Sequence, residues 1–165
     1  MTSAPPEHAV EIEVRIAAAP ATVFGFFTER DKMIQWIGRG ADLDPRPSGL
    51  FRCDINGRDV ARGEYVEVDP PNRIVFTWGW EHSEANLSPL PGKSIVEVTF
   101  EAVAEGTLVR LVHSKLPTEA RSAHGHGWDH YLARLAVAVA GGDPGPDPWG
   151  TLEGSDQEIE TEVGK

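Results

Sequence analysis

The residue with the clearest capacity for chemistry is His113, which alternates with apolar residues along the chain. Val109, Leu111 and His113 occupy every second position, a pattern typical of a half-buried strand. We therefore expect the His113 side chain to face the interior, where a neutral imidazole can hydrogen-bond a ligand or accept a proton. The competing interpretation is a structural histidine whose ring nitrogens are satisfied by Tyr65, by Tyr131 or by the backbone.

A second group of polar residues comprises His124, His126, Asp129 and His130. His126 and His130 are four residues apart, so one helix face would present both, and such a pair can bind zinc. The motif lacks the glutamate of a catalytic HExxH site, and no third ligand is evident nearby in the sequence. We expect these side chains to be solvated, with Asp129 favourable near a helix start, and we predict neither a metal nor a cofactor.

The single cysteine, Cys53, is expected on the inward face of a strand, where it acts as a small apolar filler. No helix N-terminus or paired base is suggested for it. The serines lack the context of a nucleophile elbow, and the glycines form no phosphate loop. The sequence therefore predicts no established catalytic residue, and His113 and Tyr65 remain the candidates for moving a proton.

The composition is that of one globular domain, with 165 residues of which 40% are hydrophobic and 25% charged. The net charge is −11, and residues 142–165 contribute seven carboxylates against one lysine. An acidic surface repels phosphate backbones, which argues against a nucleic-acid partner. No apolar run has the length of a membrane helix, and the N-terminus lacks the pattern of a secretory signal. One cysteine excludes an internal disulfide and fits a reducing compartment, so a cytoplasmic location is predicted.

A helix over residues 122–140 organises the rest of the chain. Trp128, Leu132, Leu135 and Val139 recur at helical spacing and form one apolar stripe. The preceding sequence predicts a strand at 10–16, short helices at 20–28 and 30–37, an edge strand at 41–46, and strands at 50–55, 58–69, 73–81, 94–104 and 107–116.

The connections between these strands are short, which makes the sheet antiparallel. Asn56-Gly57 is a strong hairpin signal, and a change of phase near Tyr65 predicts a β-bulge. We predict an α+β fold of order β-α-α-β-β-β-β-β-β-α, in which a curved sheet wraps around the long C-terminal helix. The domain spans 9–141, between a flexible lead-in at 1–8 and an acidic, Gly/Pro-rich tail at 142–165 that is predicted to be disordered.

Four segments of the sequence resemble a known superfamily. They are VEIEVRIAAAPATVFGFFTE from Val10, MIQWIG from Met33, GEYVEVDPPNRIVFTWGW from Gly63 and HGHGWDHYLARLA from His124. Together they resemble the SRPBCC (START/birch-pollen-allergen-like) helix-grip superfamily over about residues 9–140. The closest likeness is to bacterial homologues of the activator of the heat-shock-protein-90 ATPase.

The resemblance implies a deep hydrophobic cavity between the sheet and the long helix. Relatives bind lipids, polyketides, plant hormones or other apolar molecules, a few are cyclases or hydrolases, and one branch assists the chaperone. The superfamily has no universal catalytic residues to transfer to this chain. The residues expected to line the cavity are Phe27, Trp36, Phe51, Cys53, Tyr65, Phe76, Trp78, Val98, Phe100, Leu111, His113, Trp128, Tyr131 and Leu135. The competing interpretation is that these side chains simply fill the core.

Three functions follow as hypotheses. The first is binding of a small hydrophobic or aromatic molecule without catalysis. The second is a polyketide-cyclase-like enzyme in which His113 or Tyr65 moves a proton. The third is a partner of a chaperone ATPase in the stress response, which would use an exterior surface. The identity of the ligand and the oligomeric state are left open by the sequence.

Overall fold

The computed structural model describes residues 9–81 and 89–148. Its elements are β1 (Val10–Ile16), α1 (Pro20–Gly25), α2 (Arg30–Met33), β2 (Gly40–Leu43), β3 (Leu50–Asp54), β4 (Val60–Asp69), β5 (Arg73–Trp78), β6 (Ser94–Val103), β7 (Gly106–Ser114) and α3 (Thr118–Val139). The predicted lead-in at 1–8 and the part of the predicted tail beyond residue 148 lie outside the described residues.

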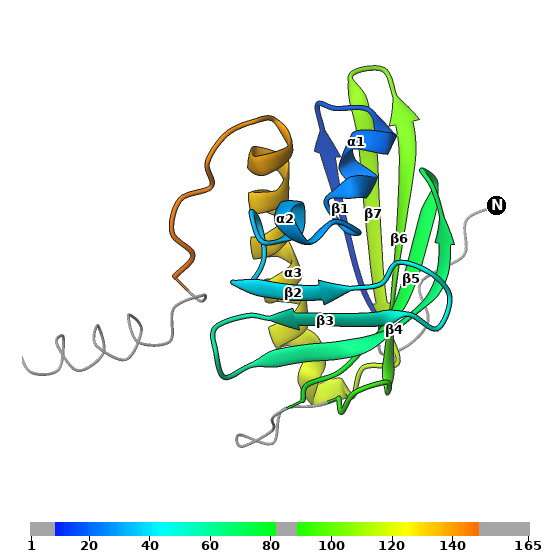
Figure 1. Ribbon diagram of the computed structural model, residues 1–165, viewed down its shortest axis with the longest axis vertical. Helices are drawn as coiled ribbons and strands as arrows, with labels where there is room; N and C mark the ends of the chain where they lie inside the picture. The colour runs from blue at the N-terminus through cyan, green and yellow to red at the C-terminus, as the bar shows by residue number, and fades with distance from the viewer. Residues whose placement is uncertain (1–8, 82–88, 149–165) are drawn as a thin grey trace, which may run out of the picture.

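The strands form one antiparallel sheet in the order β1-β7-β6-β5-β4-β3-β2. The predicted α+β architecture is therefore confirmed, including the edge position of β2. The sheet curves strongly, so that β1, β7 and β6 run roughly along α3 while β2, β3 and β4 cross it (Figure 1). The inward rows of β6 and β7 pair in register, with Val98 opposite Leu111 and Val96 opposite His113.

Two features of β4 accommodate the curvature. The register with β5 shifts between Tyr65 and Glu67, which confirms the bulge predicted near Tyr65, and a bulge bends and twists its strand. At Gly63 the neighbouring strand comes so close that a Cβ would lie 1.9 Å from the carbonyl oxygen of Thr77. Glycine has no side chain and permits this approach.

Aromatic residues of α1, α2 and their connections fill one end of the molecule. Phe24 and Phe27 pack against Phe100, with ring centroids 5.2 and 5.4 Å apart. Trp36 donates a hydrogen bond from Nε1 to the carbonyl oxygen of Phe26 at 2.9 Å. This end of the core is therefore closed by side chains.

The long helix α3 lies against the concave side of the sheet, as its apolar stripe predicts. Trp128, Leu132 and Leu135 are buried, and Val139 packs against the same core while partly exposed. None of the described helices combines the length and apolarity that a membrane crossing requires.

Candidate functional site

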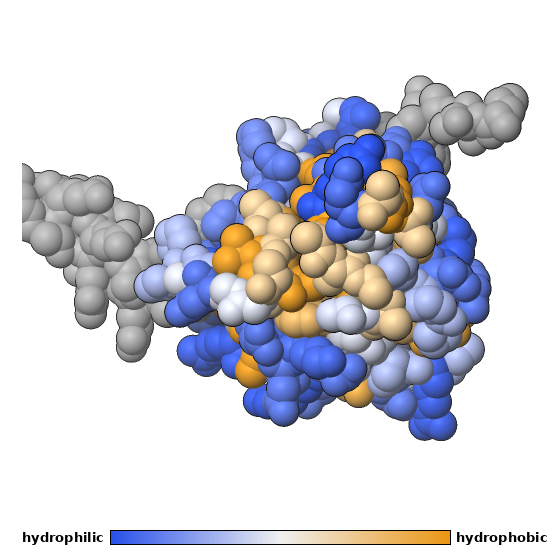
Figure 2. All heavy atoms as spheres, turned by 90° about the horizontal axis from the view of Figure 1, so that it is seen from above, coloured by the Kyte–Doolittle hydropathy of each residue, from blue (hydrophilic) through white to orange (hydrophobic). Residues whose placement is uncertain are grey.

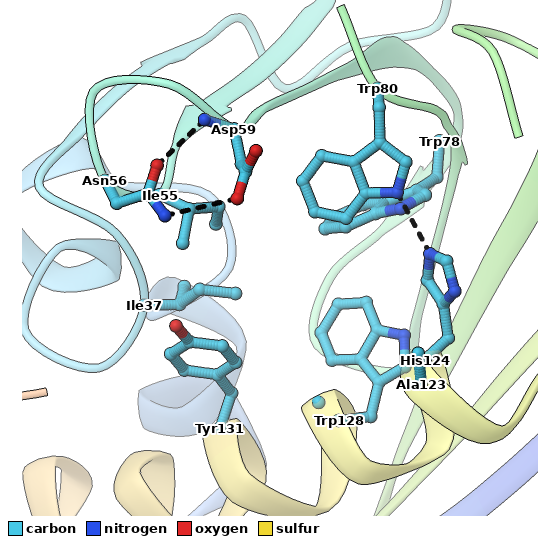
Figure 3. Close-up of a pocket in the computed structure, with 11 residues that line it drawn as sticks. Ile37, Ile55, Asn56, Asp59, Trp78, Trp80, Ala123, His124, Trp128 and Tyr131 are labelled. Atoms are coloured by element: carbon cyan, nitrogen blue, oxygen red, sulfur yellow. Dashed lines mark hydrogen bonds between the residues drawn. The ribbon is translucent and has the colours of Figure 1, made fainter. Parts of the chain in front are cut away.

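A cavity of about 280 Å³ lies between the first half of α3 and the ends of β3, β4 and β5. Its lining comes from α3, from the segment after α2, from the end of β5 and the segment that follows it, and from the β3–β4 loop (Figure 3). The lining residues are Ile37, Ile55, Asn56, Asp59, Trp78, Trp80, Ala123, His124, Gly127, Trp128 and Tyr131.

Three tryptophans form one side of the cavity, and we call them the aromatic wall: Trp78, Trp80 and Trp128. Trp78 packs against both neighbours, with ring centroids 5.4 Å from Trp80 and 5.1 Å from Trp128. Trp78 and Trp80 are two residues apart at the end of β5, so both project toward the same face. Ile37 and Tyr131 lie on the opposite side of the cavity (Figure 3).

Two polar side chains, Asn56 and Asp59, form the polar rim of the cavity. Asn56 Oδ1 accepts hydrogen bonds from the backbone N–H groups of Arg58 and Asp59, at 3.0 and 2.8 Å. Asn56 Nδ2 donates to Asp59 Oδ2 at 3.2 Å. These bonds hold the β3–β4 loop in one shape and place the Asp59 carboxylate across the cavity from Trp80 (Figure 3). The rim therefore offers a ligand a fixed acceptor.

His124 lies beside the aromatic wall and is held by two hydrogen bonds. Its Nε2 accepts from Trp80 Nε1 at 3.1 Å, and its Nδ1 lies 2.8 Å from the carbonyl oxygen of Ala120. An indole N–H can only donate, so the proton of the neutral ring is on Nδ1 and is donated to Ala120. Burial lowers the pKa of His124, although the bond to Ala120 partly opposes this effect. His124 is therefore a neutral ring with both nitrogens in use.

His113 lies behind the aromatic wall, fully buried. Trp128 Nε1 donates to His113 Nδ1 at 2.9 Å, so the ring proton is on Nε2, which lies 2.8 Å from Ser94 Oγ. Ser94 in turn donates to the carbonyl oxygen of Trp78 at 2.8 Å. Burial lowers the pKa of His113 well below its usual range, and neighbouring His124 adds to the effect. This chain of bonds fixes two members of the aromatic wall.

One polar group at the cavity lacks a partner within the described part of the chain. The indole N–H of Trp78 is buried and makes no hydrogen bond among the residues that the structure describes. An unmet buried donor costs about 1–3 kcal/mol. A small movement of the wall, or a ligand that carries an acceptor, would relieve this cost.

The predicted cavity residues divide into two groups. Trp78, Trp128 and Tyr131 line the cavity. The others are buried in the core and are absent from its lining: Phe27, Trp36, Phe51, Cys53, Tyr65, Phe76, Val98, Phe100, Leu111, His113 and Leu135.

The two candidates for proton transfer are both in the second group. Tyr65 donates its hydroxyl proton to the carbonyl oxygen of Phe27 at 3.1 Å, and burial raises its pKa. His113 is bonded to Trp128 and Ser94, not to the tyrosines or backbone named from the sequence. Neither side chain reaches the cavity in this conformation.

Cys53 behaves as the small core residue that the sequence predicts. It is fully buried, and burial raises the pKa of its thiol to about 12. No group of three or more possible metal ligands forms within residues 9–81 and 89–148. Instead, His130 Nε2 lies 2.9 Å from an oxygen of Asp147, whose other oxygen accepts from the Tyr131 hydroxyl at 2.7 Å.

Sequence reasoning missed most of the cavity lining. The helical residues Ala123, His124 and Gly127 share the face of Trp128 and Tyr131, one turn earlier, so extending the apolar stripe toward the N-terminus would have found them. Trp80 lies two residues after Trp78, so the strand alternation that assigned Trp78 to the cavity would also have assigned Trp80. No periodic signal points to Asn56 and Asp59, because they lie in a loop.

Comparison with known proteins places the chain in a family. Residues 17–140 match the family described as Activator of Hsp90 ATPase homolog 1-like protein. The solution structure of an AHSA1-like protein from Rhizobium etli is 41% identical, covers 90% of this chain and 92% of that chain, and has a TM-score of 0.68. No curated protein matches the sequence.

Two more distant structures share the fold. DynU16, a protein from the dynemicin biosynthetic locus, is 23% identical with a TM-score of 0.74. The match covers 87% of this chain but 51% of DynU16, so the chain spans about half the length of that protein. The Aha1 dimer from Colwellia psychrerythraea is 17% identical with a TM-score of 0.67, covering 79% of this chain and 95% of that chain.

Proposed function

Because the chain belongs to the family of Activator of Hsp90 ATPase homolog 1-like proteins and shares their helix-grip fold, we propose that it binds a small aromatic or apolar molecule. The binding site is the cavity between α3 and the ends of β3, β4 and β5. The observation that carries the proposal is a cavity of about 280 Å³ bordered by three tryptophans. An apolar cavity of about 150 Å³ is large enough for benzene, so this one has room for a two-ring ligand.

The energetics of packing support the same proposal. Protein interiors pack densely, and this core does so behind the cavity lining, where Phe51 stacks on Phe76 with ring centroids 4.1 Å apart. Side chains that face an empty space lose dispersion contacts. A ligand that lies against the indole rings of Trp78, Trp80 and Trp128 would restore them.

The cyclase-like alternative receives no support from the arrangement of His113 and Tyr65. A general base needs a free lone pair within hydrogen-bond reach of its substrate. The His113 lone pair is taken by Trp128, and the Tyr65 hydroxyl is bonded to Phe27. The proposal is therefore binding and not proton transfer.

The chaperone-partner alternative requires an exterior surface. The outer face of the sheet carries paired charges, such as Arg73 between Glu67 and Glu97. Apolar residues gather instead on the end of the molecule where α1 and the end of α3 lie (Figure 2). Nothing in the structure shows what would cover that end, so the cavity remains the better-supported site.

Isothermal titration calorimetry with 1-naphthalenemethanol tests the proposal. We expect saturable binding to the wild-type protein and loss of binding in Gly127→Leu, because a side chain at Gly127 enters open space at the cavity lining. Ala133→Leu places the same side chain at an exposed position of α3 and is the matched control. Unchanged affinity in Gly127→Leu, or no binding of any aromatic compound in a panel of one- to three-ring ligands, would overturn the proposal.

A further inference from the structure

We propose that the cavity selects ligands in which a protonated amine is attached to an aromatic body, over neutral or anionic ligands of the same shape. This inference rests on the proposed function and adds the chemical class of the ligand. It follows from the charges that face the cavity and from the orientation of the polar rim relative to the aromatic wall.

Asp59 supplies the formal charge of the lining. Neither a lysine nor an arginine is among the lining residues, and Asp59 forms no ion pair within the described part of the chain. Asn56 Nδ2 engages one carboxylate oxygen, Oδ2. Among the described residues no cation therefore pairs with this carboxylate, and its other oxygen retains acceptor capacity for a ligand.

The two histidines do not neutralise this charge. Trp80 donates to His124 Nε2, and Trp128 donates to His113 Nδ1. A protonated imidazole would present an N–H where each indole N–H now points, so both bonds require the neutral ring. Because both histidines are held neutral, Asp59 is the one formally charged side chain among the lining residues.

Two arginines close to lining residues in the sequence, Arg39 and Arg134, are engaged with other groups. The Arg39 guanidinium pairs with Asp54 at 3.5 Å. Arg134 donates to the carbonyl oxygens of Trp36 and Pro144. On that side the Tyr131 hydroxyl donates to Asp147, which is another carboxylate. Asp147 therefore adds a second carboxylate beside the lining residue Tyr131. The two arginines already have partners.

The aromatic wall favours a cation for an independent reason. The face of an indole ring carries a negative potential, and tryptophan is the most favourable aromatic residue for a cation. Trp80 faces Asp59 across the cavity (Figure 3). An ammonium group between them would be attracted by the ring on one side and by the carboxylate on the other. The aromatic body would pack against Trp78 and Trp128 and leave the Trp78 N–H as it is in the ligand-free protein.

Three ligands that share one naphthalene frame test the inference: 1-naphthylmethylamine, 1-naphthalenemethanol and 1-naphthoate. Alkylamines are protonated at pH 7, so the series is cationic, neutral and anionic. By calorimetry we expect the amine to bind about tenfold more tightly than the naphthoate, with the alcohol between them. Added salt should weaken binding of the amine and leave the alcohol unchanged.

Asp59→Asn removes the charge and keeps the acceptor for Asn56, so the ratio of the affinities for the amine and the alcohol should fall toward one. Glu64→Gln makes the same change of charge at an exposed position of β4 and should leave the preference intact. Equal binding of the three ligands, or a preference that survives in Asp59→Asn, would overturn this inference and leave the proposed function standing. If neither these three compounds nor any member of the panel of one- to three-ring ligands binds, the proposed function itself fails.

Discussion

Replacing Gly127 by alanine is expected to stabilise the ligand-free protein by about 1 kcal/mol. Gly127 lies inside α3 with an ordinary helical backbone, so alanine can adopt the same conformation. The gain arises because alanine restricts the unfolded chain more than glycine does. A Cβ at this position meets no other atom within 4 Å, so the methyl group enters the cavity without a steric penalty. For a domain of this size, about 1 kcal/mol raises Tm by about 4 °C.

Gly125→Ala is the matched control in the same helix. Its Cβ would contact the Val10 side chain at 3.8 and 3.9 Å, which is ordinary van der Waals contact. The same gain in helix propensity is therefore expected for both variants. Only Gly127→Ala changes the cavity, so only this variant should also alter the affinity for a naphthalene ligand.

Guanidinium denaturation of the wild-type protein and both variants gives the free energies of unfolding. Stabilisation by Gly125→Ala together with destabilisation by Gly127→Ala would refute the reasoning. That result would mean that the space beside Gly127 is filled, by water or by a shifted side chain, and is not available to a ligand.

Three further predictions concern the buried polar residues. His113→Ala should lower the free energy of unfolding by about 3 kcal/mol, measured by guanidinium denaturation, because it leaves a cavity and removes the acceptor for the buried Trp128 N–H. His113 and His124 have lowered pKa values in the folded state, so the unfolded chain takes up protons first as the pH falls below about 6.5. The free energy of unfolding should therefore decrease between pH 6.5 and 5, by up to about 1.4 kcal/mol per pH unit for each histidine. Measured by urea denaturation, it should change less steeply with pH in His124→Gln than in the wild-type protein. The exposed His126→Gln is the control and should follow the wild-type protein. Cys53 is buried and the pKa of its thiol is about 12, so Ellman's reagent should modify it only after denaturation.

Each of these predictions has an outcome that contradicts it. Unchanged stability in His113→Ala would show that the hydrogen bonds to Trp128 and Ser94 contribute nothing. If the free energy of unfolding depends equally on pH in the wild-type protein and in His124→Gln, the His124 ring is solvated or already charged. Rapid labelling of native Cys53 would place the thiol at the surface.

The fold could be predicted because each of its elements has a local signature. Alternation along β6 and β7 assigns Val98 and Leu111 to the inward face, and the helical stripe assigns Trp128 and Leu132 to the core. The Asn56-Gly57 pair predicts the β3–β4 connection. These signals depend on a few neighbouring residues, so one sequence is enough to interpret them.

The cavity could be predicted only in part, because its position depends on where the curved sheet and α3 separate. Periodicity shows that Phe51 and Trp78 both face inward. It does not show that Phe51 stacks on Phe76 while Trp78 borders a space. The hydrogen-bond partners of His113 were equally inaccessible, since Ser94 and Trp128 lie far from it in sequence on β6 and α3.

The indole N–H resonances provide the most direct test that the cavity between α3 and the sheet binds a ligand. In a ¹H–¹⁵N titration with 1-naphthylmethylamine, the indole signals of Trp80 and Trp128 should shift and saturate together. The indole of Trp36, buried and bonded to Phe26 at the closed end of the core, should stay in place and serves as an internal control. No shift at Trp80 and Trp128, or an equal shift at Trp36, would contradict the account.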